Sequence, residues 1–467
     1  MPRIAVVGAG ISGLCTAHYL VRELSAAKRD AEILILEAEE TPGGKMRTVR
    51  QDGFNMEWGP NGFLTNKPYS LELVRELGAE GRLAVSSDLA RKRFIFSGGT
   101  LHRLPESPPA FLKSKLMTTS GKLRIFMEPF IKPLSPLVED ETLADFARRR
   151  LGPEALEKLL DPMVTGIFCG DPERMSLASC FPTIREMELK HGSLVKAMLA
   201  KRKEKRRSGV KQEMSAGPGG VLTSFDDGTQ VLVDLLAGAL ADGLHTGVTV
   251  DRVERREGRY RLSVTERGRQ DEIFADAVVV STPAYAASAL LAPLDASLSD
   301  ALAAIPYAPI SVVALGYDKA TLENPLDGFG FLIPRKESRK ILGALWDSSV
   351  FPNRAPQGKA LIRAMVGGVR APELASTPAA ELLRIVRQEF RDIMGIAAEP
   401  LLGRVFFHEK GIPQYFVGHG KLLERMDAAL AAFPGLYLNS NAYRGVSLND
   451  CVLQSRLAAG RLCRELA

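Results

Sequence analysis

The sequence lacks the features that define several large classes of protein. It has only five cysteines among 467 residues, and no two of them form a CxxC pair. An odd number without such pairs argues against a disulfide framework or a zinc ribbon, and is typical of the reducing cytoplasm. No apolar run reaches the roughly 18 residues that a membrane-spanning helix needs. The chain starts MPRIAVVGAG, the pattern of a strand entering a glycine turn, so we expect no secretory signal.

Excess charge is confined to one segment. Lysine and arginine number 61 against 55 acidic residues, a net charge of +6. Residues 190–214 hold nine basic and two acidic residues and therefore contribute +7 by themselves. No nucleic-acid-binding motif accompanies this patch, so we expect no nucleic-acid partner. Residues 201–224 are rich in lysine and arginine and then in glycine, and we expect them to form a mobile loop.

Residues 108–137 interleave apolar and basic side chains. Phe111, Phe126 and Phe130 lie among lysines such as Lys113 and Lys122. Apolar groups beside cations suit an element that lies on a membrane surface. A helical subdomain with a charged exterior explains the same pattern, and the residues alone leave both interpretations open.

The first 37 residues predict a βαβ unit. A strand at Arg3–Val7 enters a glycine turn, a helix runs to about Lys28, and a second strand at Glu32–Leu36 is closed by Glu37. Strands that alternate with helices indicate a parallel sheet. The other predicted elements are a hairpin at 93–96 and 100–104, helices within 105–200 and at 230–241, 378–394 and the chain end, and strands at 248–253, 260–265, 277–282, 311–317, 329–333, 341–346 and 360–366.

The glycine turn is a candidate dinucleotide site. In its GxGxxG pattern, Gly8 permits the tight turn, Gly10 lets the backbone approach a pyrophosphate, and Gly13 lets helix and strand pack closely. The helix that follows presents free N–H groups and a positive dipole end to the phosphates. The Glu37 carboxylate, at the end of the second strand, can accept hydrogen bonds from ribose hydroxyls.

Further glycines favour FAD over NAD. The segment Thr41–Thr48 contains a Gly-Gly pair just after the ribose acid, and Glu57–Gly62 adds another glycine turn. NAD domains usually lack this extension, whereas FAD proteins of the glutathione-reductase and amine-oxidase type have it. Near the other end of the chain, Asn441–Cys451 places a glycine loop before an apolar helix, which suits the pyrophosphate and the flavin. We therefore expect both ends of the chain to hold FAD.

Seven sequence blocks, in the same order, resemble those of the oxygen-dependent, FAD-containing protoporphyrinogen oxidase family. They are GAGISG at 8–13, GPNGF at 59–63, TGIFCGDPERMSLASCFP at 165–182, GFGFLIP at 328–334, MVGG at 365–368, GIPQY at 411–415 and AYRGVSLNDC at 442–451. The first block is shared with all such flavoproteins, while GIFCGDP, GIPQY and GVSLNDC are much more specific.

The resemblance implies an α/β fold with three parts. A discontinuous, Rossmann-like FAD-binding domain of the amine-oxidase and glutathione-reductase type would take residues 1–85, 215–285 and 420–467. An α+β substrate domain would take 86–100 and 286–419. A helical membrane-binding subdomain would take 101–214, which includes the apolar-basic segment. The basic run Lys201–Arg207 is then either part of a membrane-facing surface or a disordered loop.

The resemblance also implies a reaction. The family oxidises protoporphyrinogen IX to protoporphyrin IX in haem biosynthesis, removing six electrons in three FAD cycles while dioxygen becomes hydrogen peroxide. The flavin takes the hydride, so we expect no catalytic side chain and no metal, and His408 is expected to be structural or cofactor-adjacent. The expected partners are the porphyrinogen, dioxygen and the inner face of the cell membrane. A homodimer is an option that the sequence leaves open.

Site residues follow from the motifs and the resemblance together. Arg93 matches the arginine that binds a substrate propionate. Phe329, Leu332 and Met365 match positions that sandwich the tetrapyrrole, and Gly170 matches a position whose carbonyl meets pyrrole N–H groups. Without the resemblance, the sequence favours a surface arginine at a strand end for Arg93 and core positions for Phe329, Leu332 and Met365, and Gly170 is explained as a turn glycine before Asp171. The cofactor-binding candidates are Gly8, Ala9, Gly10, Ile11, Ser12, Gly13, Glu37, Ala38, Gly44, Lys45, Gly59, Pro60, Asn61, Gly62, Val250, Gly445, Val446, Ser447 and Leu448.

Lys45 departs from the wider superfamily, in which many members carry arginine after the Gly-Gly pair. Lysine keeps the charge but not the bidentate geometry.

Other functions remain open. A coproporphyrinogen III oxidase of the same fold would act on a substrate with four carboxylates and would need a wider, more basic pocket. An amine oxidase or carotenoid desaturase shares the glycine motifs, although the C-terminal loop offers no aromatic pair beyond Tyr443. A flavin-free binding protein, like the prenyl-protein escort family, would purify colourless.

Overall fold

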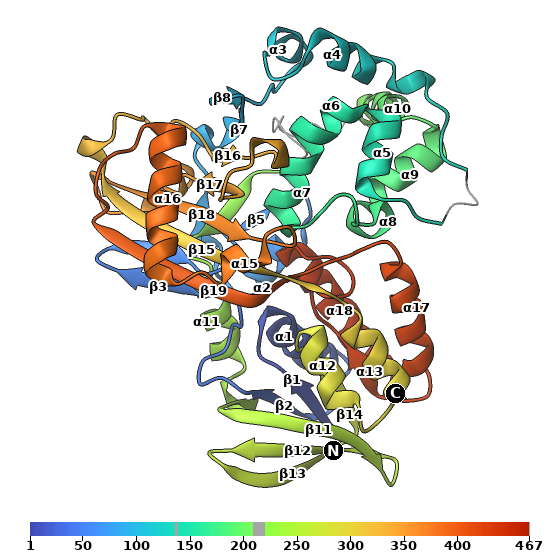
Figure 1. Ribbon diagram of the computed structural model, residues 1–467. Coiled ribbons are helices and arrows are strands. Elements are labelled where there is room, and N and C mark those ends of the chain that lie inside the picture. Colours follow the sequence, from blue (N-terminus) through green and yellow to red (C-terminus); the bar gives the residue numbers. More distant parts are fainter. Residues whose placement is uncertain (136–138, 209–219, 467) are drawn as a thin grey trace.

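Five strands from distant parts of the chain form one parallel sheet (Figure 1). The computed structural model describes residues 1–135, 139–208 and 220–466. The sheet order is β10 (Leu244–Thr246), β2 (Glu32–Glu37), β1 (Arg3–Val7), β14 (Ala277–Val280) and β20 (Leu436–Leu438), and all neighbouring pairs are parallel. Helix α1 (Ile11–Ala26) joins β1 to β2, so the βαβ unit predicted from the sequence is confirmed.

Two apolar cores cover the two faces of this sheet. Ile4 and Val6 of β1 join the first core and Ala5 and Val7 the second, because successive side chains of a strand point to opposite faces. The first core holds α1 against α11 (Gln230–Ala239) and the last helix, α18 (Leu448–Glu465). The second core contains β11 (Val248–Arg256), β12 (Arg259–Glu266), β13 (Arg269–Ala275), α12 (Ala284–Leu291), α13 (Ala296–Ala303) and α17 (His419–Leu430).

A second, mixed sheet of seven strands lies beside the parallel sheet (Figure 1). Its order is β19 (Leu402–Pro413), β15 (Tyr307–Asp318), β18 (Lys359–Gly367), β17 (Gly343–Leu345), β16 (Gly330–Leu332), β7 (Arg93–Ser97) and β8 (Thr100–Arg103). The predicted hairpin is therefore confirmed as β7–β8. One face packs against α16 (Ala379–Met394), whose buried residues Leu382, Val386 and Phe390 join the core there.

The register of the mixed sheet puts three of the predicted substrate residues, Arg93, Leu332 and Met365, on the opposite face from α16. Leu332 pairs with Gly343, and Gly343 pairs with Met365, so these three residues form one row across β16, β17 and β18. In the next row, Arg93 aligns with Gly330 and Gly330 with Leu345. The two rows lie two residues apart along each strand, and residues two apart in a strand share a face.

Small sheets connect the two large ones. A hairpin of β3 (Thr48–Gln51) and β4 (Phe54–Glu57) leads into the glycine turn at 59–62. A second small sheet has the order β5 (Phe63–Leu64), β9 (Leu222–Phe225) and β6 (Leu83–Val85). Helix α2 (Tyr69–Glu76) follows β5 and contacts α18.

Residues 108–208 form helices within the described part of the chain, and Figure 1 shows them gathered at the top of the molecule. They are α3 (Pro108–Lys113), α4 (Thr119–Phe126), α5 (Leu143–Arg150), α6 (Pro153–Ala155), α7 (Asp161–Phe168), α8 (Leu177–Cys180), α9 (Pro182–His191) and α10 (Leu194–Ser208). Arg150 and Glu128, both fully buried, form an ion pair of 2.5 Å in this segment. The predicted helical part of the fold is therefore confirmed.

The prediction that residues 201–224 form a loop is wrong at both ends. Helix α10 continues through the basic run to Ser208, and Leu222–Phe225 is strand β9. Lysine, arginine and glutamate are good helix formers, which explains why the charged run extends the helix that precedes it. The remaining residues of the predicted loop, 209–219, lie outside the described residues.

The predicted fold class is confirmed, whereas the predicted domain boundaries stay predictions. The boundary at 100 falls inside β8, which belongs to the mixed sheet, and the boundary at 214 lies outside the described residues. Across the described ranges, no helix combines the length and the apolar character that crossing a membrane requires.

Candidate cofactor and substrate site

Three glycines shape the turn between β1 and α1, each for a different physical reason. Gly8 has a φ of +97°, in the region that favours glycine. A Cβ on Gly13 would overlap the carbonyl oxygen of Gly8, so this position requires glycine for packing. A Cβ on Gly10 would meet no described atom within 4 Å. The turn therefore leaves open space in front of Gly10, where Ile11 and Ser12 begin α1.

Glu37 stands at the end of β2 and already fixes the turn. One carboxylate oxygen accepts a hydrogen bond from the Ala9 N–H at 2.7 Å, and the other accepts one from the Glu39 N–H at 3.0 Å. Each oxygen keeps a lone pair for a further donor. Ala38 is exposed beside it, and Val250 packs in the same core as Leu36, one residue before Glu37.

Two other glycine segments meet the first turn, as predicted from the sequence. The Gly43 N–H donates to the Ala9 carbonyl at 2.8 Å, and Gly43 forms a β-bridge with Gly10. A Cβ on Gly44 would lie 3.6 Å from the Gly10 Cα. A Cβ on Gly59 would clash with the Lys45 carbonyl oxygen. The segments 8–13, 43–45 and 59–62 therefore line one region around Gly10.

Lys45 ties this region to the mixed sheet. Its Nζ donates to the carbonyl oxygens of Lys410 and Gly411 at the end of β19, the latter at 2.6 Å, and lies 5.5 Å from the centre of the Tyr307 ring. Burial lowers the pKa of Lys45 to about 8. The ammonium is thus bound to protein carbonyls, so the prediction that Lys45 contacts the cofactor applies best to its main chain.

His408 lies next to the same region and has a structural contact. Its Nε2 donates to the Trp58 carbonyl at 3.0 Å, and its ring meets the Trp58 ring edge-on. Burial lowers the pKa of His408, which favours the neutral ring in this position.

Buried charges hold the glycine turn at 59–62. Arg363 of β18 forms an ion pair with Asp347 and donates to the carbonyl oxygen of Glu57 at 2.8 Å. The Asn61 amide donates to Asp347 at 3.2 Å. Arg354 pairs with the Glu57 carboxylate at 2.7 Å. Pro60 is exposed, and Gly62 lies against the Thr223 carbonyl of β9. The mixed sheet thereby fixes the position of a predicted cofactor loop.

The loop at 445–447 leads into helix α18, whose first turn is capped. Ser447 caps α18 and forms a capping box with Asp450. Gly445 has a φ of +105°, Val446 is half-buried, and Leu448 is the first residue of the helix. The first N–H groups of a helix have no partner within the helix. The cap uses the N–H groups of Ser447 and Asp450, while the positive end of the α18 dipole lies at this turn, and the assignment of the loop to the cofactor stays a prediction.

Sequence reasoning missed Tyr415 and His419, which shape that loop. The Tyr415 hydroxyl accepts a hydrogen bond from the Gly445 N–H at 2.9 Å and donates to the Asn441 carbonyl at 2.6 Å. The His419 ring stacks on Tyr415 with 4.2 Å between ring centres, and its Nε2 donates to the Tyr443 carbonyl at 2.9 Å. Tyr415 lies in the quoted GIPQY block, but its partner is thirty residues further along the chain.

The residues present fit a dinucleotide cofactor. Besides the space at Gly10, the hydroxyls of Ser281 and Thr282 are buried without a partner among the described atoms. Both residues follow β14, the neighbour of β1, and a Cβ on Gly8 would lie 3.3 Å from the Thr282 methyl carbon. Buried hydroxyls without partners are costly unless something else bonds them. Thr282, which the sequence analysis did not select, is therefore an additional cofactor-binding candidate.

Arg93 and Phe329, both predicted substrate residues, lie together. The Arg93 guanidinium stands 5.1 Å from the centre of the Phe329 ring, a cation–π contact. Within the part of the chain that the structure describes, no carboxylate lies within ion-pair distance of Arg93. Desolvation lowers the pKa of Arg93, although the residue is exposed overall. Its neighbour Lys92, in contrast, is paired with Asp327.

Leu332 of β16 and Met365 of β18 lie on one face of the mixed sheet, and Gly170 follows helix α7. Leu332 and Met365 lie in one row of the mixed sheet with Gly343 between them. Helix α7 lies close above Leu332, because a Cβ on Gly166 would stand 2.7 Å from a Leu332 methyl carbon. Gly170 follows the end of this helix and is buried, and a Cβ there would overlap the Met175 sulfur. The structure thus places Arg93, Leu332 and Met365 on one face of the mixed sheet, brings Phe329 next to Arg93, and leaves Gly170 at the end of α7.

Comparisons with known proteins agree with this arrangement. The model of the family described as flavin-containing amine oxidoreductase matches residues 11–463. The coproporphyrinogen III oxidase of Bacillus subtilis is 31% identical over 97% of this chain and 96% of its own. The chloroplastic protoporphyrinogen oxidase of Nicotiana tabacum is 31% identical over 96% of this chain and 83% of its own.

Solved structures show the same likeness. A crystal structure from Exiguobacterium sp. 255-15, described as a candidate protoporphyrinogen oxidase, matches with a TM-score of 0.83 and 27% identity over 99% of both chains. The cyclohexylamine oxidase of Brevibacterium oxydans matches with a TM-score of 0.71 over 100% of this chain and 99% of its own. At 19% identity, this second likeness shows the fold alone.

Proposed function

Because the chain belongs to the flavin-containing amine oxidoreductase family, we propose that it uses its FAD to oxidise protoporphyrinogen IX to protoporphyrin IX. The observation that carries the substrate class is Arg93. It is a cation without a carboxylate partner among the described residues, next to Phe329 and on the sheet face that holds Leu332 and Met365. A guanidinium without a carboxylate partner suits a propionate, and apolar side chains suit a flat tetrapyrrole.

The protein's own contribution is binding and orientation. FAD, when bound, accepts the hydride from the reduced macrocycle. Arg93 anchors one propionate, and the row formed by Leu332 and Met365 supports the ring. Gly170, at the end of α7, offers backbone carbonyl oxygen to pyrrole N–H groups. The pyrroles lose their protons by tautomerisation, so this scheme needs no acid or base from the chain. Holding both partners in a fixed orientation supplies the rate enhancement.

Coproporphyrinogen III is the second candidate substrate. The observation that favours it is the coproporphyrinogen III oxidase of Bacillus subtilis, at 31% identity over nearly the whole of both chains. Against it, Arg93 is the one cation among the predicted substrate residues, whereas coproporphyrinogen carries four carboxylates. A site for four propionates would need further cations, so the predicted residues fit protoporphyrinogen better.

Anaerobic mixing tests the proposal and separates the two substrates. Each porphyrinogen is mixed with the yellow protein in the absence of dioxygen, and flavin absorbance at roughly 450 nm is followed together with porphyrin fluorescence. We expect protoporphyrinogen to bleach the flavin with the higher ratio of rate to apparent Kd. A higher ratio for coproporphyrinogen would assign the second substrate. Failure of both to bleach the flavin would reject a porphyrinogen oxidase.

Dioxygen is proposed as the electron acceptor. Removing six electrons through a two-electron flavin requires three reoxidations, so each porphyrin should appear with three molecules of hydrogen peroxide. Peroxide and porphyrin measured in one aerobic reaction give this ratio directly. Porphyrin formation without peroxide, or dependent on an added quinone, would contradict dioxygen as acceptor.

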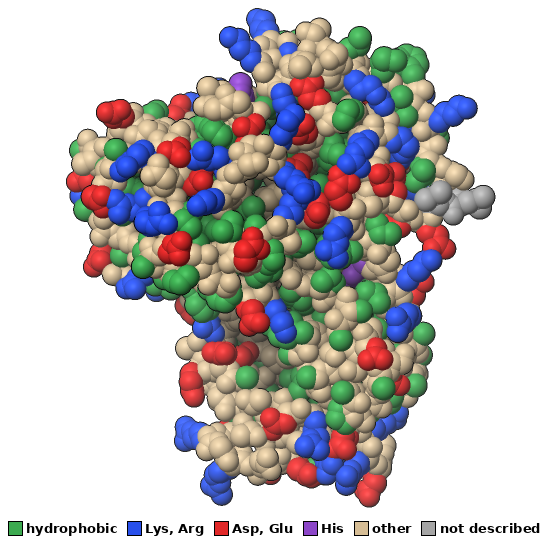
Figure 2. All heavy atoms as spheres, in the orientation of Figure 1, with side chains coloured by type: hydrophobic (Ala, Val, Ile, Leu, Met, Phe, Trp, Pro, Cys, Tyr) green, Lys and Arg blue, Asp and Glu red, His purple; other side chains and the backbone are tan. Residues whose placement is uncertain are grey.

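We also propose that the helical segment lies on an anionic membrane surface at the inner face of the cell membrane. Phe130 is 83% exposed and Phe126 is 50% exposed, and both lie among basic residues. Figure 2 shows apolar side chains interspersed with blue Lys and Arg over the top of the molecule, where Figure 1 places these helices. Such a surface binds an anionic membrane in two ways. The apolar side chains bury apolar area in the lipid, and the cations attract the anionic head groups.

Flotation with phosphatidylglycerol vesicles tests the membrane proposal. The double variant Phe126→Ser/Phe130→Ser and a variant with serine at the basic positions of Lys201–Arg207 should each float less than the parent protein. Phe274→Ser, at an exposed phenylalanine of β13, is the matched control and should float normally. Equal flotation of all four proteins would contradict a membrane-facing helical segment.

A further inference from the structure

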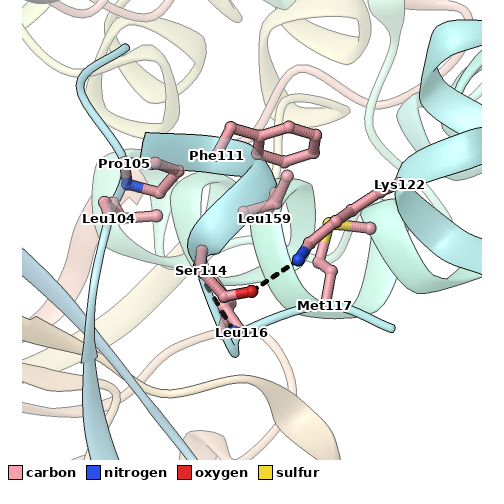
Figure 3. A pocket seen from close by; sticks show the side chains of 8 residues that line it. All are labelled: Leu104, Pro105, Phe111, Ser114, Leu116, Met117, Lys122 and Leu159. Atoms are coloured by element: carbon pink, nitrogen blue, oxygen red, sulfur yellow. Dashed lines mark hydrogen bonds between the residues drawn. The ribbon is translucent and has the colours of Figure 1, made fainter. Parts of the chain in front are cut away.

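A separate apolar cavity lies between the end of the β7–β8 hairpin and the first helices of the helical segment. It has a volume of about 210 Å³, and its apolar walls are Leu104, Phe111, Leu116, Met117 and Leu159. Figure 3 shows Phe111 of α3 next to Leu159, and Lys122 of α4 pointing towards Ser114. Leu116 and Met117 are buried and close the inner end.

The opening of this cavity carries hydrogen-bond donors. The Lys122 Nζ donates to the carbonyl oxygens of Leu112 at 2.9 Å and Ser114 at 2.6 Å. An ammonium has three N–H groups, so one remains for another acceptor. The Ser114 Oγ accepts a hydrogen bond from the Leu116 N–H at 3.2 Å, and its own O–H is still available as a donor. In the ranges that the structure covers, Lys122 has no carboxylate within ion-pair distance.

We propose that this cavity binds the chain of a single-chain carboxylate amphiphile, such as a fatty acid. The apolar walls would take the alkyl chain, and Lys122 with Ser114 would take the carboxylate. A charge-assisted pair with an ammonium and a hydroxyl suits this head group. The volume is below the 300–1,000 Å³ that is usual for pockets of drug-sized ligands, which suits a narrow chain rather than a macrocycle.

The surroundings of the cavity explain how such a chain would arrive. Leu112 and Leu123, on the two helices beside the opening, are 56% and 60% exposed. Phe126 meets Phe111 edge-on, with ring centres 6.2 Å apart, so the exposed apolar surface is continuous with the cavity wall. A free fatty acid would reach the cavity over this apolar surface, and the inference does not depend on the proposed reaction.

Binding is measured without turnover, on the flavin-loaded protein. Dodecanoate labelled with ¹³C at the carboxyl carbon is titrated below its micelle-forming concentration, and NMR and calorimetry report saturation. Dodecanol and dodecyltrimethylammonium, with the same chain and different head groups, are the ligand controls. We expect one saturable site for dodecanoate, weaker binding of dodecanol, and none of the cationic amphiphile.

Two variants and their matched controls locate the site. Lys122→Gln removes the charge and should weaken dodecanoate about tenfold while leaving dodecanol unchanged. Leu159→Trp fills the cavity and should abolish saturable binding of both. The controls are Lys190→Gln and Leu189→Trp, on exposed positions of α9 in the same helical segment, and they should bind like the parent. Circular dichroism and flavin content confirm that each variant is folded.

Three results would overturn the proposal. They are absence of saturable dodecanoate binding by the parent, equal loss of binding in Leu159→Trp and Leu189→Trp, and displacement of dodecanoate by protoporphyrin, which would place both ligands in one site.

Discussion

The carbonyl oxygen of Gly8 occupies the place that a side chain on Gly13 would need. A Cβ on Gly13 would overlap that oxygen, whereas a Cβ on Gly10 would meet no described atom within 4 Å. The presence of glycine at these two positions of one motif therefore has two different physical explanations. Gly13 is required by the packing of α1 against the turn, while nothing in the described protein requires glycine at position 10. The space at Gly10 is explained by the cofactor.

This contrast predicts different outcomes for two equal substitutions. Gly10→Val should fold with a normal melting temperature but purify without flavin, because its side chain would occupy the approach of the pyrophosphate. Gly13→Val should lose about 2 kcal/mol or more of unfolding free energy, since the helix must move away from the turn. Thermal unfolding of the flavin-stripped proteins and absorbance of the purified proteins measure the two effects separately. A yellow Gly10→Val protein would contradict the assignment of this space.

The local elements could be predicted because their signals are local. The strand at Arg3–Val7 was predicted with its observed bounds, and the hairpin that starts at Arg93 was found because a glycine turn separates two short apolar runs. The basic run is the exception, because its charge suggests a loop although its residue types favour the helix that the structure shows.

Contacts between distant residues could not be predicted from the sequence. Arg363 reaches the carbonyl oxygen of Glu57, and Tyr415 reaches Gly445, only because the sheets bring these segments together. The row of Leu332 and Met365 likewise depends on strand register, which a single sequence does not specify for strands far apart in the chain. The glycine motifs identified the cofactor region, but the residues that hold it in place became visible only in the folded chain.

Arg93 should control substrate affinity more than chemistry. Removing a charge-assisted hydrogen bond costs about 1.5–3 kcal/mol, so Arg93→Ala should raise the apparent Kd for the porphyrinogen about 10- to 100-fold. The rate of flavin bleaching at saturating substrate should change little. Arg93→Lys should be intermediate, because lysine keeps the charge without the planar fork. Arg103→Ala, on the exposed end of the same hairpin, serves as the control, and an unchanged Kd in Arg93→Ala would remove Arg93 from the site.

Tyr415 should act on the cofactor through the loop that it holds. In Tyr415→Phe, the Gly445 N–H and the Asn441 carbonyl lose their partner, at a cost of about 1–3 kcal/mol. Because this loop leads into the capped start of α18, the variant should release FAD faster than the parent. Tyr260→Phe is the matched control, since that buried hydroxyl donates to the Pro434 carbonyl away from the loop. If stopped-flow flavin dissociation is accelerated equally in both variants, or is unaffected in both, this role is contradicted.

His419 should make the same loop sensitive to acid. Burial lowers the pKa of His419 from its ordinary value of 6.5, and nearby Arg444 lowers it further, while the hydrogen bond to the Tyr443 carbonyl acts in the opposite direction. As pH falls through 6.5, the unfolded chain therefore takes up a proton that the native ring resists. The unfolding free energy should fall by at most about 1.4 kcal/mol per pH unit from this group, with the full contribution present above pH 6.5.

The variant His419→Gln should flatten that dependence. Its unfolding free energy, measured by denaturant titration between pH 5 and 7.5, should vary less with pH than that of the parent. His408, whose pKa burial also lowers, contributes a slope of the same sign and remains in this variant. His245→Gln, at an exposed position of β10, controls for simple loss of a histidine. Because His419 stacks on Tyr415, flavin release should begin over the same pH range as the loss of stability. If the unfolding free energy of the parent and of His419→Gln depends on pH with the same slope, the native His419 ring takes up its proton as readily as the unfolded chain does. That result would contradict the prediction.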